Sequence, residues 1–322
     1  MIHLVTHRAD SRGAASASDG TSPAARATRP SGPPRRRISP TARRQRRAAF
    51  LFLAPACAMV ALYVVWPVLS TIHLSFYHWD GMTDPTFVGL ANYVELFHSE
   101  TFYTALKNNV IWLVLFLLAP PMGLAIALYL NQAVAGIRIV KSLFFAPFVL
   151  SGVVVGLIFS WFYDPTFGLL ALIVGHGVPV LGDPRYATFG IIFAALWPQT
   201  AYCMILYLTG LTTLSSEQVE AARMEGAKGW ALLWHVILPQ LRPTTFMAVV
   251  VTVIGALRSF DLISVMTGGG PFDSSTVLAY YMYDQAIKYY RLGYSAAIAV
   301  VLFAIMLIYI VYQLRRLLRN ER

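Results

Sequence analysis

The sequence predicts an all-α, polytopic membrane protein with six transmembrane helices, and its composition, its apolar runs and one polar stretch support this fold class. Of the 322 residues, 57% are hydrophobic and only 12% are charged, whereas about 25% of the residues of a soluble domain are charged. Six apolar runs of roughly 20 residues or more are each long enough to cross a hydrocarbon core about 30 Å thick as a helix. A charged, helix-forming stretch, residues 215–243, lies between two of these runs.

The six spans are expected at residues 48–72, 110–130, 142–163, 187–208, 244–266 and 294–314. A seventh apolar stretch, residues 167–181, is interrupted by two glycines and a proline, so we expect it to pack at an interface or to re-enter rather than to span. The pair Pro120–Pro121 and the single Pro147 are expected to kink the second and third spans, because proline removes a helical hydrogen bond.

The positive charge of the chain is concentrated at its N-terminus. Residues 1–47 hold 11 Arg and two Asp, whereas the rest of the chain is nearly neutral. The arm has few large apolar residues, so we predict a disordered basic cytoplasmic arm (1–47) followed by one transmembrane domain (48–322). Contact of the arm with anionic lipid is favoured over binding to nucleic acid. The first apolar run is too long for the core of a signal peptide, which favours a span.

Lysine and arginine near the ends of the spans predict the orientation, because these residues concentrate in cytoplasmic loops. With the arm inside, nine further basic residues lie on the inner side: Arg138, Lys141, Arg223, Lys228, Arg242, Arg315, Arg316, Arg319 and Arg322. Only four lie outside, namely Lys107, Arg185, Lys288 and Arg291. Both termini and the stretch 215–243 are therefore expected to be cytoplasmic.

The stretch 215–243 has the pattern of a helical hairpin. Ser215 and Gln218 have the spacing of a capping box, which predicts that a helix begins there. Gly226 is placed to end that helix in a left-handed conformation. A second helix, residues 227–237, has tryptophans and leucines that we expect to pack beneath the membrane bundle, and Pro239 is expected to stop it. The small, charged tip between the two helices suits docking into a groove on a soluble partner.

The sequence EAARMEGAKGWALLWHVILP, residues 220–239, resembles the EAA loop of binding-protein-dependent ABC importer permeases. The match extends to FVGLANYVELF (87–97) and TGGGP (267–271), which resemble segments of the carbohydrate-uptake type, whereas GLLALIV after Phe167 lacks an Asn found in many members. The resemblance implies the type I importer permease fold. It also implies that the coupling helix of this loop fits a cleft of an ATPase subunit, and the residues carried over to this role are Glu220, Ala221, Ala222, Gly226, Leu238 and Pro239.

The same resemblance implies a complex in a bacterial plasma membrane. Its other members would be a second permease subunit, two ATPase subunits that bind ATP and Mg²⁺, and an extracytoplasmic solute-binding protein. The solute would be a sugar or a related polyol or glycerol-phosphate compound, moved by alternating access. The chain has no G-x-x-x-x-G-K-[ST] motif, which predicts that it binds no nucleotide itself and needs no cofactor of its own.

Five residues are candidates for a solute pathway. Arg258 and Asp261 lie three positions apart in the fifth span and are expected on one helix face. They form either a self-neutralising pair or a polar lining of the pathway. Trp197, Gln199 and Tyr202 in the fourth span could contact a sugar or anchor the helix at the interface. For five tyrosines before the sixth span, Tyr280, Tyr281, Tyr283, Tyr289 and Tyr290, we favour the role of anchors.

Two other classes of membrane protein are alternatives for an apolar chain of this kind. An ion- or proton-coupled carrier would usually show internal repeats of spans, and none is found. A membrane-embedded transferase would need clustered acids or metal ligands. The sequence contains neither H-E-x-x-H nor G-x-S-x-G, so no catalytic or metal site is predicted. Cys57 and Cys203 both lie inside predicted spans, where we interpret them as small apolar packing residues.

Overall fold

The computed structural model describes residues 52–132 and 136–320 of the chain. The predicted arm (1–47) and the first residues of the first predicted span lie outside these ranges. The chain divides into two compact units, Met1–Ala58 and Met59–Arg322. In the second unit, helices account for nearly all the described regular structure. The described strands are one pair of two residues each. The all-α prediction is confirmed.

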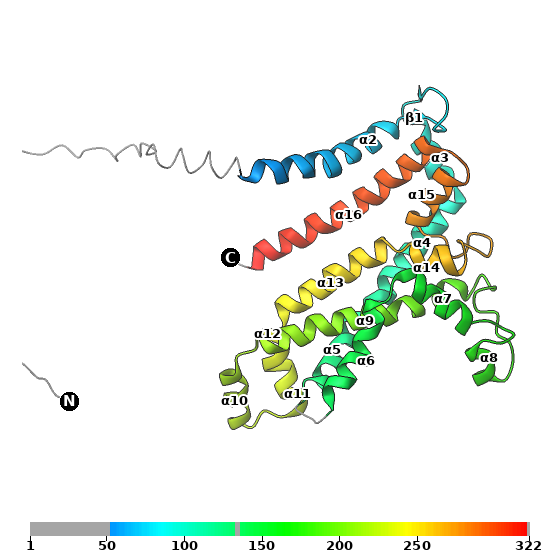
Figure 1. Ribbon diagram of the computed structural model, residues 1–322. Coiled ribbons are helices and arrows are strands. Elements are labelled where there is room, and N and C mark those ends of the chain that lie inside the picture. The colour runs from blue at the N-terminus through cyan, green and yellow to red at the C-terminus, as the bar shows by residue number, and fades with distance from the viewer. Residues whose placement is uncertain (1–51, 133–135, 321–322) are drawn as a thin grey trace, which may run out of the picture. The chain divides into compact units, whose positions relative to one another are not determined.

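The elements follow one another along the chain, and Figure 1 labels most of them. They are η1 (Ala61–Val65), α2 (Trp66–Leu74), β1 (Tyr77–His78), β2 (Thr86–Phe87), α3 (Ala91–His98), α4 (Glu100–Phe116), α5 (Ala119–Leu130), α6 (Ile137–Val149), α7 (Gly152–Phe162), α8 (Leu169–Val174), α9 (Ala187–Thr212), α10 (Ser216–Met224), α11 (Gly229–Leu232), η2 (Leu233–Ile237), α12 (Leu238–Gln240), α13 (Arg242–Leu257), α14 (Asp261–Met266), α15 (Leu278–Ile287) and α16 (Leu292–Asn320). The two elements labelled η are turns of wider, π-helical geometry.

Five helical stretches of the described chain are long and apolar enough to cross a membrane. They are Phe52–Leu74, Glu100–Leu130, Ala187–Thr212, Arg242–Met266 and Leu292–Arg316. A sixth span is possible if α6 and α7 are taken together, although the two helices are bent by 100° at the break between them. The predicted set of apolar spans is therefore present, with the third one broken.

The break in the third span does not lie at Pro147. This proline is accommodated inside α6, which continues to Val149. Leu150 then adopts an extended conformation, and Ser151 caps the N-terminus of α7 by accepting a hydrogen bond from Val154 N at 3.3 Å. A capping serine after an extended residue starts a new helix in a new direction. The chain therefore does not kink at the proline. It changes direction by 100° three residues later, at Leu150.

The fifth span is also interrupted. Its first part, α13, ends at Leu257, and Arg258 forms the C-cap with φ −96° and ψ 7°. Phe260 has φ −141°, outside the helical region, and Asp261 begins α14. The expectation that Arg258 and Asp261 share one helix face is therefore wrong, because the helical register is lost between them.

The seventh apolar stretch contains only the short helix α8. Its six residues correspond to roughly 9 Å of helix, far less than a membrane core. Gly175 ends this helix with φ +82°, a conformation that favours glycine. The prediction that this stretch does not span the membrane is confirmed.

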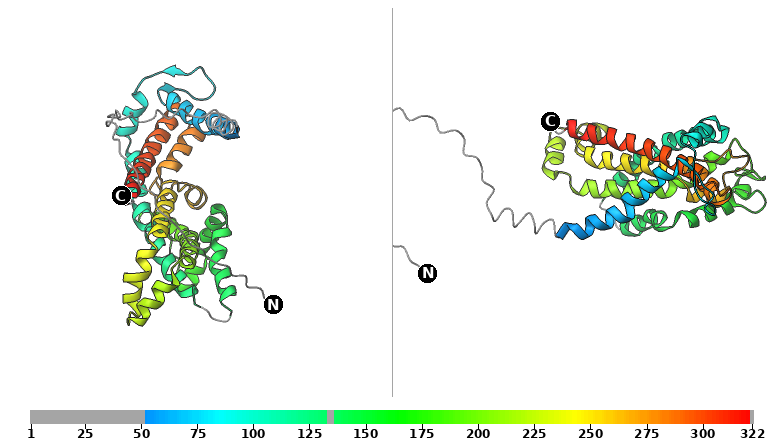
Figure 2. Two further views of the ribbon diagram at one scale, coloured as in Figure 1. Left: turned by 90° about the vertical axis from the view of Figure 1, so that its left-hand side faces the viewer. Right: turned by 90° about the horizontal axis from the view of Figure 1, so that it is seen from above.

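In the second unit, the long helices lie in succession. α16 contacts α2 on one side and α13 on the other, and α13 in turn contacts α9 (Figure 1). Seen from above, α13 and α16 run side by side (Figure 2). The elements α10 to α12 lie with the C-terminal part of α16 at one end of this unit, and β1, α3 and α15 lie at the other end.

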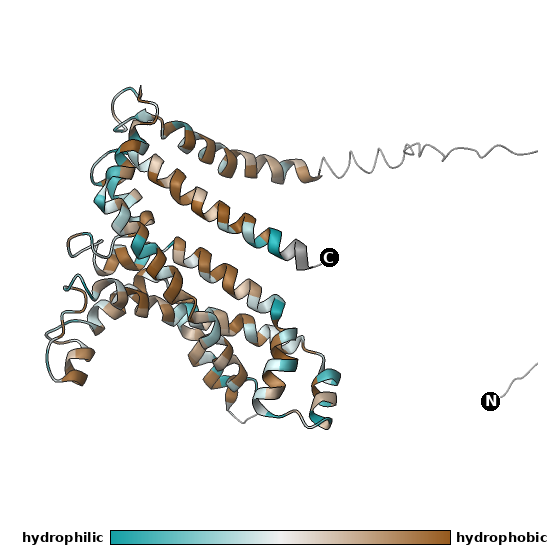
Figure 3. Cartoon of the chain, turned by 180° about the vertical axis from the view of Figure 1, so that it is seen from behind, coloured by the Kyte–Doolittle hydropathy of each residue, from teal (hydrophilic) through white to brown (hydrophobic). Residues whose placement is uncertain are grey.

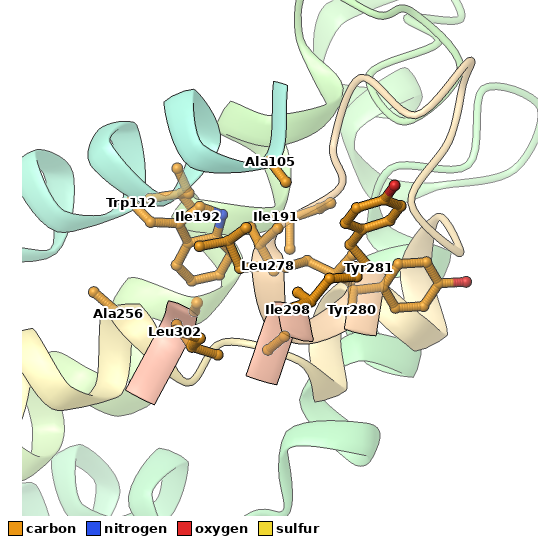
Figure 4. Packing of buried hydrophobic residues seen from close by; sticks show 14 of the residues in the cluster. Ala105, Trp112, Ile191, Ile192, Ala256, Leu278, Tyr280, Tyr281, Ile298 and Leu302 are labelled. Atoms are coloured by element: carbon orange, nitrogen blue, oxygen red, sulfur yellow. The ribbon is translucent and has the colours of Figure 1, made fainter. Parts of the chain in front are cut away.

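The unit has two cores of buried side chains. The larger core joins α4, α9, α15 and α16, and Figure 4 shows Ile191 and Leu278 near its centre, with Trp112 and Ile298 beside them. The smaller core joins α5, α9 and α13 around Met204. In an apolar 18-residue window of each of the four long helical stretches from Glu100 onwards, between a third and a half of the residues are buried inside the chain. The remaining apolar side chains face outward, as a lipid or protein environment within a membrane requires. Figure 3 shows mostly hydrophobic residues along the long helices and more hydrophilic ones toward the hairpin.

Candidate functional site

The first helix of the hairpin has a defined cap at each end. Ser215 is the N-cap and accepts a hydrogen bond from Gln218 N at 3.4 Å, as its spacing predicts. At the other end Gly226 has φ +93°, and Ala227 N donates to Ala222 O at 2.9 Å while Gly226 N donates to Arg223 O at 3.0 Å. These two bonds form a Schellman motif, which satisfies the last carbonyls of the helix. The chain therefore turns sharply at the residue that the sequence indicated.

A side chain from the far end of the hairpin closes its base. The N–H of Ser215 donates to Gln240 Oε1 at 3.2 Å, and Gln240 Nε2 donates to Val236 O at 3.2 Å. In a capping box, the side chain of Gln218 would occupy the first of these positions. Sequence reasoning missed Gln240, because the capping pattern is local and Gln240 is 25 residues away.

The second helix of the hairpin differs from its prediction. It begins at Gly229 and continues through Pro239 to Gln240. A wider turn precedes the proline, in which Leu238 N donates to Leu233 O, five residues earlier. In an α-helix the ring of Pro239 would collide with the carbonyl of His235, and the wider turn avoids this collision. The expectation that Pro239 ends the helix is therefore wrong.

The motif residues are accessible at the hairpin. Glu220, Ala221 and Gly226 are exposed, and the other three, Ala222, Leu238 and Pro239, are half-buried. The expectation that the tryptophans of the second helix pack against the chain is wrong. Trp230 and Trp234 are 71% and 60% exposed, and they stack on one another with ring centroids 6.2 Å apart. The hairpin thus presents small residues, an acid and two indole rings on its surface.

Four of the five pathway candidates line one cavity of about 450 Å³. Gln199 and Tyr202 reach it from α9, Arg258 lies at the end of α13 and Asp261 at the start of α14. We call it the central cavity. Sequence reasoning missed Phe148 of α6, which stacks on Tyr202 with ring centroids 5.2 Å apart and also lines the cavity. No sequence signal distinguishes Phe148 from the other phenylalanines of α6.

The side chain of Gln199 also connects two helices. Its Nε2 donates to Thr252 Oγ1 of α13 at 2.9 Å, and Thr252 is fully buried. The amide oxygen of Gln199 makes no hydrogen bond within the described chain and remains available as an acceptor. Gln199 can therefore hold α9 against α13 and still present a polar atom to the cavity.

Trp197 lies elsewhere. It lines an apolar cavity of about 580 Å³ between α5, α6, α7 and α9, together with Phe159 and Phe193. Two positions along a helix rotate a side chain by about 200°, so Trp197 and Gln199 face opposite sides of α9. The structure does not bring Trp197 together with the other four candidates.

Arg258 and Asp261 are not an ion pair. The described residues contain two salt bridges, Lys288–Asp284 and Arg291–Glu95, the second with N···O 2.5 Å. The contacts of Lys288 with Asp284 and, secondarily, Tyr280 raise its pKa. Arg258 and Asp261 are instead exposed at the central cavity. A self-neutralising pair is thus excluded in this conformation, and both side chains are open to the cavity.

The tyrosines before the sixth span have two different environments. Tyr280 and Tyr281 are 4% and 6% exposed and belong to the larger core, so they are not interfacial anchors. Tyr289 and Tyr290 are 61% and 56% exposed. Among the described residues, no group of three or more His, Cys, Asp or Glu side chains could hold a metal ion.

The hairpin and most of the residues that line the central cavity lie within a segment that matches a known family. Residues 119–320 match the family described as binding-protein-dependent transport system inner membrane component. The chain belongs to this family. It is a membrane permease component of an ABC transporter rather than an enzyme, which sets aside the carrier and transferase alternatives.

Relatives of known name cover most of the permease. It is 36% identical over 266 residues to the probable ABC transporter permease protein PH1215 of Pyrococcus horikoshii, covering 80% of this chain and 91% of the relative. It is 35% identical to the multiple sugar-binding transport system permease protein MsmF of Streptococcus mutans, with 82% and 93% covered. It is 31% identical to the sn-glycerol-3-phosphate transport system permease protein UgpA of Agrobacterium fabrum, with 83% and 93% covered.

Solved structures show the same fold. A chain of a bacterial ABC transporter involved in the import of the acidic polysaccharide alginate matches the permease with a TM-score of 0.76 and 20% identity, covering 87% of this chain and 98% of that one. A second structure of a bacterial alginate transporter, in complex with an alginate pentasaccharide-bound periplasmic protein, matches with a TM-score of 0.73 and 21% identity. It covers 84% of this chain and 93% of that one.

Proposed function

We propose that this permease imports a sugar or a related polyol or glycerol-phosphate compound through the central cavity, driven by an ATPase that binds the hairpin. The solute class is supported by the relatives, whose names refer to multiple sugars and to sn-glycerol-3-phosphate. Gln199, Tyr202, Arg258 and Asp261 would contact the solute. Trp197 is not in this set, because it lines the apolar cavity instead.

The geometry of the hairpin carries the proposed coupling to an ATPase. The small side chains of Ala221 and Ala222 let another backbone approach closely, and Glu220 adds a charge on the exposed helix. Gly226 fixes the direction of the turn, and the hydrogen bond between Ser215 and Gln240 closes the base. The hairpin follows α9 and precedes α13 in the chain. Because the turn and the base hold its shape, a movement of the hairpin would be passed on to these two helices.

The proposed complex contains this chain, a second permease subunit, two ATPase subunits and an extracytoplasmic solute-binding protein, in a bacterial plasma membrane. A periplasmic protein is present in the solved complex of one structural relative, which supports the last of these partners. ATP and Mg²⁺ would bind to the ATPase subunits, with both termini of this chain in the cytoplasm. The neighbouring genes should encode these partners, and a thermal-shift screen of the binding protein should identify the solute.

Replacement of Gly226 tests the coupling role. No atom lies within 4 Å of a Cβ placed at this glycine, so a side chain there causes no collision. The cost of a substitution comes from φ +93°, which β-branched residues do not tolerate. We expect Gly226→Val to abolish uptake of the identified solute into membrane vesicles, with membrane insertion unchanged.

The matched control is Gly226→Asn, because asparagine adopts the left-handed conformation more readily than other residues. This variant should retain most of the uptake. Normal uptake by Gly226→Val, or equal loss in both variants, would contradict the proposed role of the turn.

A further inference from the structure

A second, smaller cavity follows the central cavity in the direction of the hairpin. Its volume is about 290 Å³. Lys141, Ser142 and Phe145 of α6 line one side, and four residues of α9 between Met204 and Thr209 line the other. We call it the lower cavity.

The two cavities use the same faces of the same two helices. On α9, Tyr202 lines the central cavity, and Ile205 and Thr209, three and seven positions later, line the lower one. On α6, Phe148 lines the central cavity, and Phe145 and Lys141 line the lower one at the same spacing. Positions separated by three, four and seven residues share one helix face. The lower cavity therefore continues the central cavity along α6 and α9.

An aromatic pair marks the junction between the cavities. Phe148 and Tyr202 stack with ring centroids 5.2 Å apart and an interplanar angle of 19°. Phe145 lies one turn before Phe148 in α6, toward the lower cavity, and the two ring centroids are 5.6 Å apart. A solute passing from one cavity to the other would have to separate or pass this stacked pair.

The lower cavity has a single charge, and that charge is positive. Lys141 is half-buried, and within the described ranges no carboxylate lies within salt-bridge distance of it. The sequence contains no Asp or Glu between Glu100 and Asp164 or between Asp183 and Glu217, so α5, α6 and α9 carry no acid. The cavity therefore attracts anions more strongly than the central cavity, where Arg258 is accompanied by Asp261.

Lys141 is the principal hydrogen-bond donor that the lower cavity offers to a ligand, because the hydroxyl groups beside it already donate to backbone carbonyls. Ser142 Oγ donates to Arg138 O at 3.1 Å, and Thr209 Oγ1 donates to Ile205 O at 3.1 Å. Both hydroxyl protons are thus used within their own helices. The ammonium group of Lys141 has three N–H donors for a ligand.

We propose that the lower cavity is a second binding station for the solute, in which Lys141 binds a carboxylate, phosphate or sulfonate group. This inference rests on the proposed role of the central cavity as the solute pathway. It narrows the solute class to sugar derivatives that carry a negative charge. Lys141 acts as a residue that determines specificity at the inner end of the route.

Thiol accessibility tests the proposal without knowledge of the solute. In the full complex in membranes, with Cys57 and Cys203 replaced by serine, a single thiol is introduced by Ile205→Cys. The probes are two methanethiosulfonates, one with a sulfonate and one with a trimethylammonium group, each added with and without ATP. The reaction rate of each probe with the protein is divided by the rate of the same probe with a free thiol in solution. We expect Lys141→Met to reduce the ratio of the sulfonate rate to the ammonium rate by about tenfold.

Two controls separate the possible outcomes. Arg138→Met removes a charge one turn earlier on α6 that does not line the cavity, and it should change the ratio by less than about twofold. Ser259→Cys places a reporter in the central cavity, and its reactivity also shows that each variant folds. A ratio that is insensitive to Lys141→Met overturns the proposal. So does a thiol at 205 that reacts with neither probe while the thiol at 259 reacts. If neither thiol reacts, the proposed pathway itself is wrong.

Discussion

At the scale of single residues, a close contact between α5 and α9 beside the smaller core depends on a glycine. A Cβ added at Gly123 of α5 would lie 2.6 Å from Cys203 Cβ and 2.7 Å from Met204 N of α9. Backbone atoms of α9 cannot move aside as a flexible side chain could. Small residues allow such close approach of helices within membranes. Cys203 is also fully buried, in agreement with its predicted role as a packing residue.

Substitution of Gly123 should therefore destabilise the permease. We expect Gly123→Ala to lower the free energy of unfolding by about 1–3 kcal/mol, because overpacking forces the two helices apart. Thermal unfolding of the detergent-purified complex would measure the loss. Gly255→Ala is the matched control: Gly255 also lies inside a spanning helix, but its nearest contact would be Gln199 Oε1 at 3.6 Å. An equal loss of stability in both variants would contradict the explanation.

The pathway residues show what sequence can predict about single side chains. Hydropathy predicts the fourth span, and side-chain chemistry alone makes Trp197, Gln199 and Tyr202 candidates for either solute contact or anchoring. An apolar helix gives no periodic signal for its rotation, so the sequence does not separate the direction of Trp197 from that of the other two. The true direction of Trp197 depends on the packing of α6 and α7 against α9, which is a tertiary property. Phe148 was missed for the same reason.

At the scale of elements, the caps of the hairpin were predictable and its closure was not. Ser215 and Gly226 act through bonds to residues three to five positions away, so their roles follow from local spacing. The bond from Ser215 N to Gln240 joins opposite ends of the hairpin and depends on the path of the second helix. That path in turn depends on the wider turn before Pro239, for which the sequence gives only the proline as a sign.

In the structure the N–H of Ser215 donates to the side chain of Gln240 and not to that of Gln218. We expect Gln240→Leu to open the base of the hairpin and to increase the rate of tryptic cleavage at Arg223 and Lys228 by roughly two- to tenfold, the equivalent of one lost hydrogen bond. Cleavage is followed in inside-out membrane vesicles by peptide mass. Gln218→Leu is the control, since the Gln218 side chain makes no hydrogen bond within the described chain. Faster cleavage in the control instead would mean that the local capping box operates.

The broken spans belong to the same scale. Hydropathy averages over a window, so it detects the third and fifth spans but not the interruptions at Leu150 and Phe260. In each case a polar residue follows the interruption: Ser151 caps α7, and Asp261 is the first residue of α14. Arg258 and Asp261 lie on the two sides of the fifth break, and both line the central cavity. In an unbroken helix, the two side chains could line one cavity only if they shared a helix face.

At the scale of the whole molecule, the described permease has different surfaces at its two ends. The hairpin lies at one end and β1, α3 and α15 at the other (Figure 1). The basic residues expected on the cytoplasmic side include those of the hairpin and the C-terminal part of α16, in accordance with this arrangement. The central and lower cavities lie between these ends along α6 and α9. Force applied at the hairpin would thus act on α9, one of the helices that line the proposed route.

This arrangement predicts the energy source of transport. A carrier driven by protons would need an acid that titrates inside the route. Asp261 is the one acid among the residues that line the two cavities, and α5, α6 and α9 contain no acid that could pass a proton on toward the hairpin. The exposed hairpin, in contrast, suits a partner that moves on ATP hydrolysis. In proteoliposomes that contain the whole complex, uptake of the identified solute should therefore require enclosed ATP and should stop with vanadate. It should continue when a protonophore collapses the proton gradient. Uptake that proceeds with enclosed ADP and fails with the protonophore would show that the hairpin is not the point at which energy enters.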